Sequence, residues 1–269
     1  MKQDVRRTVS STFTRLFMGL TLLLVTACIP NAPKNVAESV AENVVKLESF
    51  TVQTDDGETI AATLKHPDIN DGDKVPAVIF IHQGGSSKDE WINTSLFETV
   101  VATGFVALAY DVRGHGQSSG QGGAHLFDDP DLAPRDLKAA LIYLRTLPYV
   151  DPERIAIVGS SIGANLACVA LGQDIYGVSR AVAISGKTSA VYNLAGGRDQ
   201  LTTLSGLYAI ASENEQGGKR AQWARDLYQE APNQNKLEIT ANSNRHGTSI
   251  FKDDPTLEGR ILDWLKGEL

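Results

Sequence analysis

The sequence is poor in cysteine and histidine, and its charge balance is not basic. Only two cysteines occur among 269 residues, so a framework of several disulfides is excluded. Acidic residues outnumber basic ones by 32 to 25, and the resulting net charge of −7 argues against a nucleic-acid-binding surface. Five histidines leave few candidates for a general base. Apolar residues make up 42% of the chain, which is enough for a packed core.

The N-terminal segment lacks an apolar run long enough to span a bilayer. Residues 16–26 are 11 mostly apolar residues, and four basic residues precede them: Lys2, Arg6, Arg7 and Arg15. This arrangement is typical of a signal peptide. The run ends in the sequence VTAC, which resembles the lipobox of bacterial lipoproteins and would make Cys28 the lipidated N-terminus. We therefore expect a signal peptide over 1–27 and a lipidated tether over 28–45. An ordinary secretory signal with a chance cysteine is the alternative.

The lipoprotein resemblance implies a location and a membrane contact. A lipid on Cys28, with palmitate among its acyl chains, would anchor the protein in the bacterial cell envelope. By the sorting rules of that family, Ile29 after the cysteine implies the outer membrane if the host is Gram-negative. Cys168 would then have no disulfide partner, and we expect it to be a small buried side chain. The sequence makes no prediction of oligomeric state.

From residue 46 onward, strand-like and helix-like segments alternate. Strands are expected at eight places: 46–54, 58–66, 76–82, 104–111, 155–158, 180–185, 207–212 and 236–241. Helices are expected over 91–101, after Asp131 and Pro134, after Ser161, over 219–228 and after Pro255. Ser87 and Glu90 have the spacing of a capping box for the first of these helices. Alternation of this kind predicts one α/β domain over 46–269, with a mostly parallel central sheet and helices on both faces.

The stretch RIAIVGSSIGANLA, residues 154–167, has the order strand, G-x-S-x-G, helix. This is the order of a nucleophile elbow, in which a tight turn exposes a serine at the N-terminus of a helix. Gly159 and Gly163 lack the bulk that such a turn excludes, so Ser161 is the predicted nucleophile. A second G-x-S-x-G, residues 116–120, lies in a Gly- and Ser-rich run with no apolar helix behind it, and we interpret it as a loop.

A serine hydroxyl needs a histidine to take its proton and a carboxylate to orient that histidine. His246 lies in the loop after the last predicted strand. In an open α/β sheet, the catalytic side chains lie at the carboxyl ends of the strands, where this loop begins. Two carboxylates, Glu213 and Glu215, follow the preceding strand. The chain order Ser161, Glu, His246 is that of an α/β-hydrolase, and at this point both glutamates remain candidates.

These motifs resemble the α/β-hydrolase superfamily, and in particular the dienelactone-hydrolase-like esterases. The resemblance covers roughly residues 46–268. It includes the DPERI segment before the elbow, the ASENE segment over 211–215, and His246 followed by Gly247. The second segment is similar to the family's A-x-x-N-D pattern, which makes Glu215 the implied acid, although the family usually has Asp there. Glu213 is the second choice.

Acyl transfer also requires donors for the oxyanion. The backbone N–H of Ile162, directly after the nucleophile, is one expected donor. The second donor is expected in the sequence HQGG over 82–85, which resembles the family's HG-x-G loop. There we expect the Gln83 N–H, with Gly84 as the second choice and His82 as a structural hydrogen-bonding residue. The loop over 111–116 resembles one that shapes the pocket edge in this superfamily.

Together these features predict a serine hydrolase that acts on carboxylic esters or a related acyl bond. A small-molecule or acyl substrate is implied, and no metal or organic cofactor is implied. The segment over 186–205 is too short for a large cap domain. Two alternatives remain: a peptidase or acyltransferase with the same triad, and a binding lipoprotein that kept the fold and lost catalysis.

Overall fold

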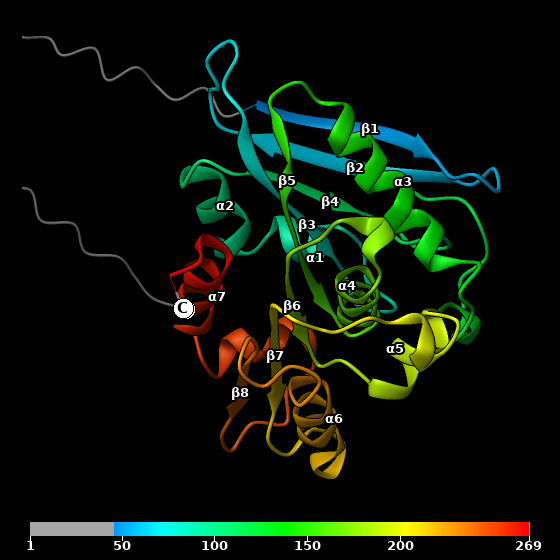
Figure 1. The fold of residues 1–269 in the computed structure, drawn as a ribbon, viewed down its shortest axis with the longest axis vertical. Coiled ribbons are helices and arrows are strands. Elements are labelled where there is room, and N and C mark those ends of the chain that lie inside the picture. The colour runs from blue at the N-terminus through cyan, green and yellow to red at the C-terminus, as the bar shows by residue number, and fades with distance from the viewer. Residues whose placement is uncertain (1–45, 269) are drawn as a thin grey trace, which may run out of the picture. The chain divides into compact units, whose positions relative to one another are not determined.

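The structure is a computed structural model that describes residues 46–268 (Figure 1). The predicted signal peptide, Cys28 and the tether lie outside the described residues. Eight strands form one sheet in the order β1-β2-β4-β3-β5-β6-β7-β8. Their bounds are β1 Lys46–Gln53, β2 Thr59–His66, β3 Val75–Ile81, β4 Val106–Tyr110, β5 Val150–Ser160, β6 Arg180–Ile184, β7 Leu207–Ser212 and β8 Lys236–Thr240.

The sheet is antiparallel only at its first edge. Strands β1 and β2 form a hairpin through the Asp55-Asp56-Gly57 turn, and β2 pairs antiparallel with β4. Every other pair, from β4 and β3 across to β7 and β8, is parallel. The predicted mostly parallel sheet is therefore confirmed, and the carboxyl ends of β3 and β5–β8 lie along one edge.

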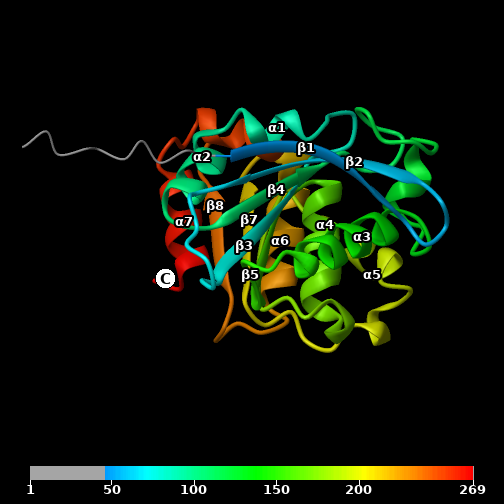
Figure 2. The same cartoon turned by 90° about the horizontal axis from the view of Figure 1, so that it is seen from above.

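Helices cover both faces of the sheet (Figures 1 and 2). They are α1 Asp89–Ile92, α2 Ser95–Ala102, α3 Ala133–Thr146, α4 Ile162–Gly172, α5 Thr188–Leu194, α6 Lys219–Tyr228 and α7 Leu257–Lys266. Alternate residues of β3 point to opposite faces. Ile79 packs in the cluster under α3–α6, whereas Phe80 packs in the cluster under α1, α2 and α7. The two apolar clusters hold the sheet between two helical layers.

The helix expected over 91–101 is interrupted. The short α1 ends at Ile92, and Thr94 caps the start of α2, because its hydroxyl accepts a hydrogen bond from the Phe97 N–H at 3.3 Å. The predicted capping box of Ser87 and Glu90 is wrong, because α1 has no side-chain cap and the Glu90 carboxylate bonds elsewhere. The spacing of Ser87 and Glu90 predicts a local contact, whereas the Glu90 carboxylate accepts from the Gln83 N–H and from the Ser160 hydroxyl.

The connections at the carboxyl edge are compact. Between β6 and β7 lie only α5 and a short 3-10 turn, Arg198–Gln200, so the structure has no large cap there. Among the described residues, no helix is both long and apolar enough to cross a membrane.

Candidate active site

The predicted elbow is present between β5 and α4. Ser161 has φ 52° and ψ −107°, a conformation that L-residues rarely adopt. A Cβ on Gly159 would lie 2.1 Å from the Gly163 carbonyl, and a Cβ on Gly163 would lie 2.1 Å from the Ile81 carbonyl oxygen. Neither position can hold a larger residue without moving backbone. The turn therefore requires both glycines and presents Ser161 at the start of α4.

Glu215 and His246 meet beside this turn. Glu215 follows β7, and its Oε1 lies 2.5 Å from Nδ1 of His246 in the loop after β8. Because Nδ1 donates to the carboxylate, Nε2 is left without a proton in the neutral ring and can accept one. The Glu213 carboxylate is instead exposed and accepts the Asn242 N–H at 2.8 Å. The structure thus brings Glu215, and not Glu213, to His246.

Ser161 and His246 line the same cavity, which has a volume of about 500 Å³. Its wall contains no carboxylate side chain. The lining residues are Gly84, Gly85, His115, Gly123, Phe127, Ser161, Arg220 and His246. The loop after β3, the loop over 111–123 and the 3-10 turn Ala124–Phe127 thus line the cavity together with the elbow serine.

Arg220 is a wall residue that the sequence analysis did not identify. Its guanidinium donates to the Ser185 carbonyl oxygen at 2.6 Å, and its Nε lies 3.3 Å from Glu215 Oε1. The same group lies over the Trp223 ring at 5.2 Å. Burial lowers the pKa of Arg220, although Glu215 opposes that effect. A residue on the first turn of a predicted helix carries no sequence signal for such a role.

The two expected oxyanion donors differ in their surroundings. Ile162 is the first residue of α4, where N–H groups have no acceptor within the helix. The Gln83 N–H, in contrast, already donates to Glu90 Oε2 at 2.9 Å, while Glu90 Oε1 accepts the Ser160 hydroxyl at 2.5 Å. Gln83 is also absent from the cavity lining, whereas Gly84 is part of it. This geometry favours Gly84, the second choice from the sequence.

His82 and Arg113 support these loops. The His82 ring donates from Nδ1 to the Gln83 carbonyl at 2.7 Å and accepts the Val112 N–H on Nε2 at 2.9 Å. Burial lowers the pKa of His82 and so favours this neutral form. The buried Arg113 pairs with Asp56 at 2.7 Å and with Asp136 at 2.8 Å. The structural role expected of His82 agrees with these contacts.

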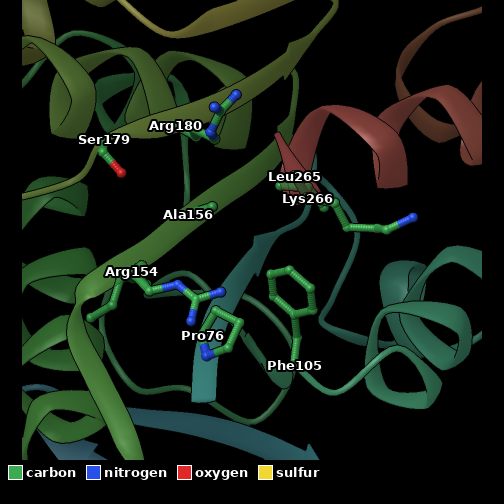
Figure 3. Close-up of a pocket in the computed structure, with 9 residues that line it drawn as sticks. Pro76, Phe105, Arg154, Ala156, Ser179, Arg180, Leu265 and Lys266 are labelled. Atoms are coloured by element: carbon green, nitrogen blue, oxygen red, sulfur yellow. The ribbon is translucent and has the colours of Figure 1, made fainter. Parts of the chain in front are cut away.

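A second cavity, of about 210 Å³, lies at the amino ends of the parallel strands (Figure 3). Its lining includes Pro76 near the start of β3, Arg154 and Ala156 in β5, Arg180 at the start of β6, and Lys266 at the end of α7. None of the predicted catalytic residues lines it. Active sites of parallel α/β sheets form at the carboxyl ends of the strands, so we place the candidate site in the larger cavity.

Solved structures share this fold. The Pyrococcus furiosus esterase Pf2001 aligns with a TM-score of 0.63 at 18% identity, covering 82% of this chain and 92% of that one. A putative dipeptidyl aminopeptidase IV from Bacteroides ovatus aligns with a TM-score of 0.66 at 18% identity, covering 84% of this chain and 36% of that one. At such identities the likeness shows the fold alone.

Sequence comparisons reach the same family. The uncharacterised Escherichia coli K12 protein YcjY is 30% identical over 144 residues, which are 53% of this chain and 44% of that relative. The chain thus spans less than half the length of this curated relative. The alpha/beta hydrolase fold family matches residues 76–248, a range that includes Ser161, Glu215 and His246. The protein is therefore a member of the α/β-hydrolase fold family.

Proposed function

We propose that this protein is a serine hydrolase that cleaves carboxylic esters or a related acyl bond through Ser161, His246 and Glu215. The observation that carries the proposal is the 2.5 Å contact between Glu215 and His246, on a cavity that Ser161 also lines. Membership of the α/β-hydrolase fold family supports hydrolysis as the reaction class. The identity of the acyl bond goes beyond that support and is part of the proposal.

In the proposed mechanism, Ser161 Oγ attacks the acyl carbon while His246 Nε2 takes the hydroxyl proton. Glu215 is nearly fully buried, so its negative charge stabilises the imidazolium strongly. The Ile162 and Gly84 N–H groups would hold the oxyanion. His246 then gives its proton to the leaving group. Water attacks the acyl-enzyme with His246 as base, and the proton returns to Ser161 as the acid product leaves.

Covalent labelling with a fluorophosphonate probe tests the proposal. We expect wild type to be labelled and Ser161→Ala and His246→Ala to lose labelling, because only an activated serine reacts rapidly with the probe. Glu215→Ala should be labelled much more slowly, while Glu213→Ala serves as the matched control and should match wild type. A folded wild type that is not labelled would overturn the hydrolase proposal and favour the non-catalytic binding protein.

A peptidase or acyltransferase with the same three residues is the second candidate. The fold similarity to the putative dipeptidyl aminopeptidase favours testing it. A panel should compare p-nitrophenyl esters with aminoacyl p-nitroanilides, and should include an added alcohol as acyl acceptor. Higher kcat/KM on the anilides would replace the esterase proposal with the peptidase, and transfer to the alcohol in preference to water would indicate an acyltransferase.

We also propose that Cys28 is lipidated and anchors the protein in the cell envelope. This proposal rests on the sequence, because Cys28 lies outside the described residues. Cys28→Ala should release the protein from the membrane fraction and abolish incorporation of labelled palmitate. Cys168→Ala is the matched control, because Cys168 is fully buried and burial raises its pKa to about 12. Equal incorporation in Cys28→Ala and wild type would contradict the anchor.

A further inference from the structure

Backbone strain is concentrated at the carboxyl edge of the sheet. Four non-glycine residues among residues 46–268 have positive φ: Ser161 at 52°, Ser185 at 58°, Gln216 at 51° and Asn242 at 55°. They lie after four successive strands, β5, β6, β7 and β8. Each such conformation is strained and persists where the surrounding contacts enforce it.

Three of these residues belong to segments that the proposed function already uses. Ser161 is the proposed nucleophile, Gln216 directly follows Glu215, and Asn242 lies in the loop that leads to His246. Ser185, after β6, has no part in that mechanism. Its strain therefore requires a separate explanation.

The Ser185 hydroxyl joins the acid loop to the histidine loop. This side chain is fully buried, and its Oγ donates to Glu215 Oε2 at 2.8 Å. The same Oγ accepts the N–H of Gly247, the residue after His246, at 3.1 Å. One hydroxyl thus provides a hydrogen-bond partner both for the Glu215 oxygen that does not contact His246 and for the buried Gly247 N–H.

The backbone of Ser185 is fixed from both sides. Its N–H donates to the Ile210 carbonyl at 2.8 Å, which ties it to β7. Its carbonyl accepts from Arg220 at 2.6 Å, and Arg220 also lies 3.3 Å from Glu215. These contacts hold the strained conformation, and that conformation directs the hydroxyl at Glu215.

We propose that Ser185 is a positioning residue that acts through Glu215 and sets the orientation of His246. The inference rests on the proposed function, because it assigns Ser185 to the same triad. With one carboxylate oxygen held by Ser185, the other is held at Nδ1 of His246. Loss of the hydroxyl frees the carboxylate to rotate and leaves the Gly247 N–H without this acceptor.

Ser185→Gly is the primary test, because glycine adopts positive φ without strain and removes only the side chain. We expect kcat to fall about 10- to 100-fold while KM stays within about twofold, since a misplaced catalytic group slows chemistry more than it weakens binding. Ser185→Ala should show the same loss. The melting temperature of Ser185→Gly should be no lower than that of Ser185→Ala, because glycine relieves the backbone strain. Equal losses of kcat in the two variants would then show that the missing hydroxyl, and not strain, lowers activity.

A double-mutant cycle separates positioning from a merely structural effect. If Ser185 acts through Glu215, Ser185→Gly placed in a Glu215→Gln background should slow fluorophosphonate labelling by less than about twofold. A further tenfold loss in that background would overturn the inference. Arg154→Ala is the control, because Arg154 is exposed and lies at the opposite end of the parallel strands; it should leave kcat unchanged.

The two proposals fail in distinguishable ways. If wild type is labelled and Ser185→Gly retains full kcat, the positioning role is overturned and the serine hydrolase stands. If folded wild type is not labelled, the serine hydrolase itself is overturned.

Discussion

The two ends of the parallel sheet each have a cavity, but they differ in how their residues are held. The carboxyl-end cavity, about 500 Å³, is lined by Ser161, and the other three positive-φ non-glycine residues of the described chain also follow parallel strands at this edge of the sheet. The amino-end cavity, about 210 Å³, is lined by three cationic side chains, Arg154, Arg180 and Lys266, and by none of the strained residues. Strain, and not the number of charges, coincides here with the proposed chemistry.

Two of the three cationic side chains at the amino end, Arg180 and Lys266, have partners of their own. Arg180 donates to the Trp264 carbonyl at 3.2 Å and lies over the Trp264 ring, while Lys266 pairs with Glu268 at 2.8 Å. At the carboxyl end, one buried carboxylate, Glu215, contacts Ser185, Arg220 and His246. The contacts of Arg180 and Lys266 are thus separate, whereas those at the carboxyl end share one carboxylate.

The largest expected effect is a loss of activity caused by a change at the carboxyl end. Glu215→Gln should keep the fold and lower kcat about 10⁴-fold, because an amide can hold the wrong histidine tautomer and cannot stabilise the imidazolium. Glu213→Gln, the matched control, should stay near wild type because its carboxylate bonds only the Asn242 N–H among the contacts described. Ester hydrolysis under steady-state conditions checks both. Equal losses in the two variants would contradict the assignment of Glu215.

The next effect concerns stability and compares two helical glycines. Gly163→Ala should destabilise the fold by about 3 kcal/mol, because the new Cβ would lie 2.1 Å from the Ile81 carbonyl oxygen. Gly259→Ala in α7 should stabilise it by about 0.5–1 kcal/mol, because no atom lies within 4 Å of that Cβ and alanine favours helix. Urea unfolding measures both values. Similar free energies of unfolding for the two variants would contradict the tight packing of the elbow.

Much of the fold could be predicted from the sequence. The elbow, the parallel sheet and the α6 range over 219–228 follow from local patterns, because spacing and glycine placement encode them directly. The local spacing predicts a capping box for Glu90, yet its carboxylate joins Gln83 to Ser160, which is 70 residues away. Ser185 and Arg220 gave no signal at all. Contacts between loops depend on the assembled sheet, so local pattern cannot show them.

A smaller effect is expected from pH, again at the carboxyl end. Burial holds the pKa of His82 below 6.5 in the folded protein. As pH falls, His82 is therefore protonated in the unfolded chain at a higher pH than in the folded protein. Stability from neutral His82 is present above pH 6.5 and is lost as pH falls, by at most about 1.4 kcal/mol per pH unit. Urea unfolding at pH 7.5 and 5 should show less acid loss in His82→Gln than in wild type. An equal loss of stability in both proteins would contradict a contribution of His82 to acid destabilisation.

The smallest effect is expected at the amino end. Arg154 is exposed, so Arg154→Ala should change the free energy of unfolding by less than about 0.5 kcal/mol. Ester kcat/KM should stay within about twofold, because the strained residues and their interlocking contacts all lie at the other edge of the sheet. The same assays run beside Glu215→Gln give the comparison directly. A tenfold loss of kcat/KM in a folded Arg154→Ala would couple the amino-end cavity to catalysis and remove the distinction between the two ends.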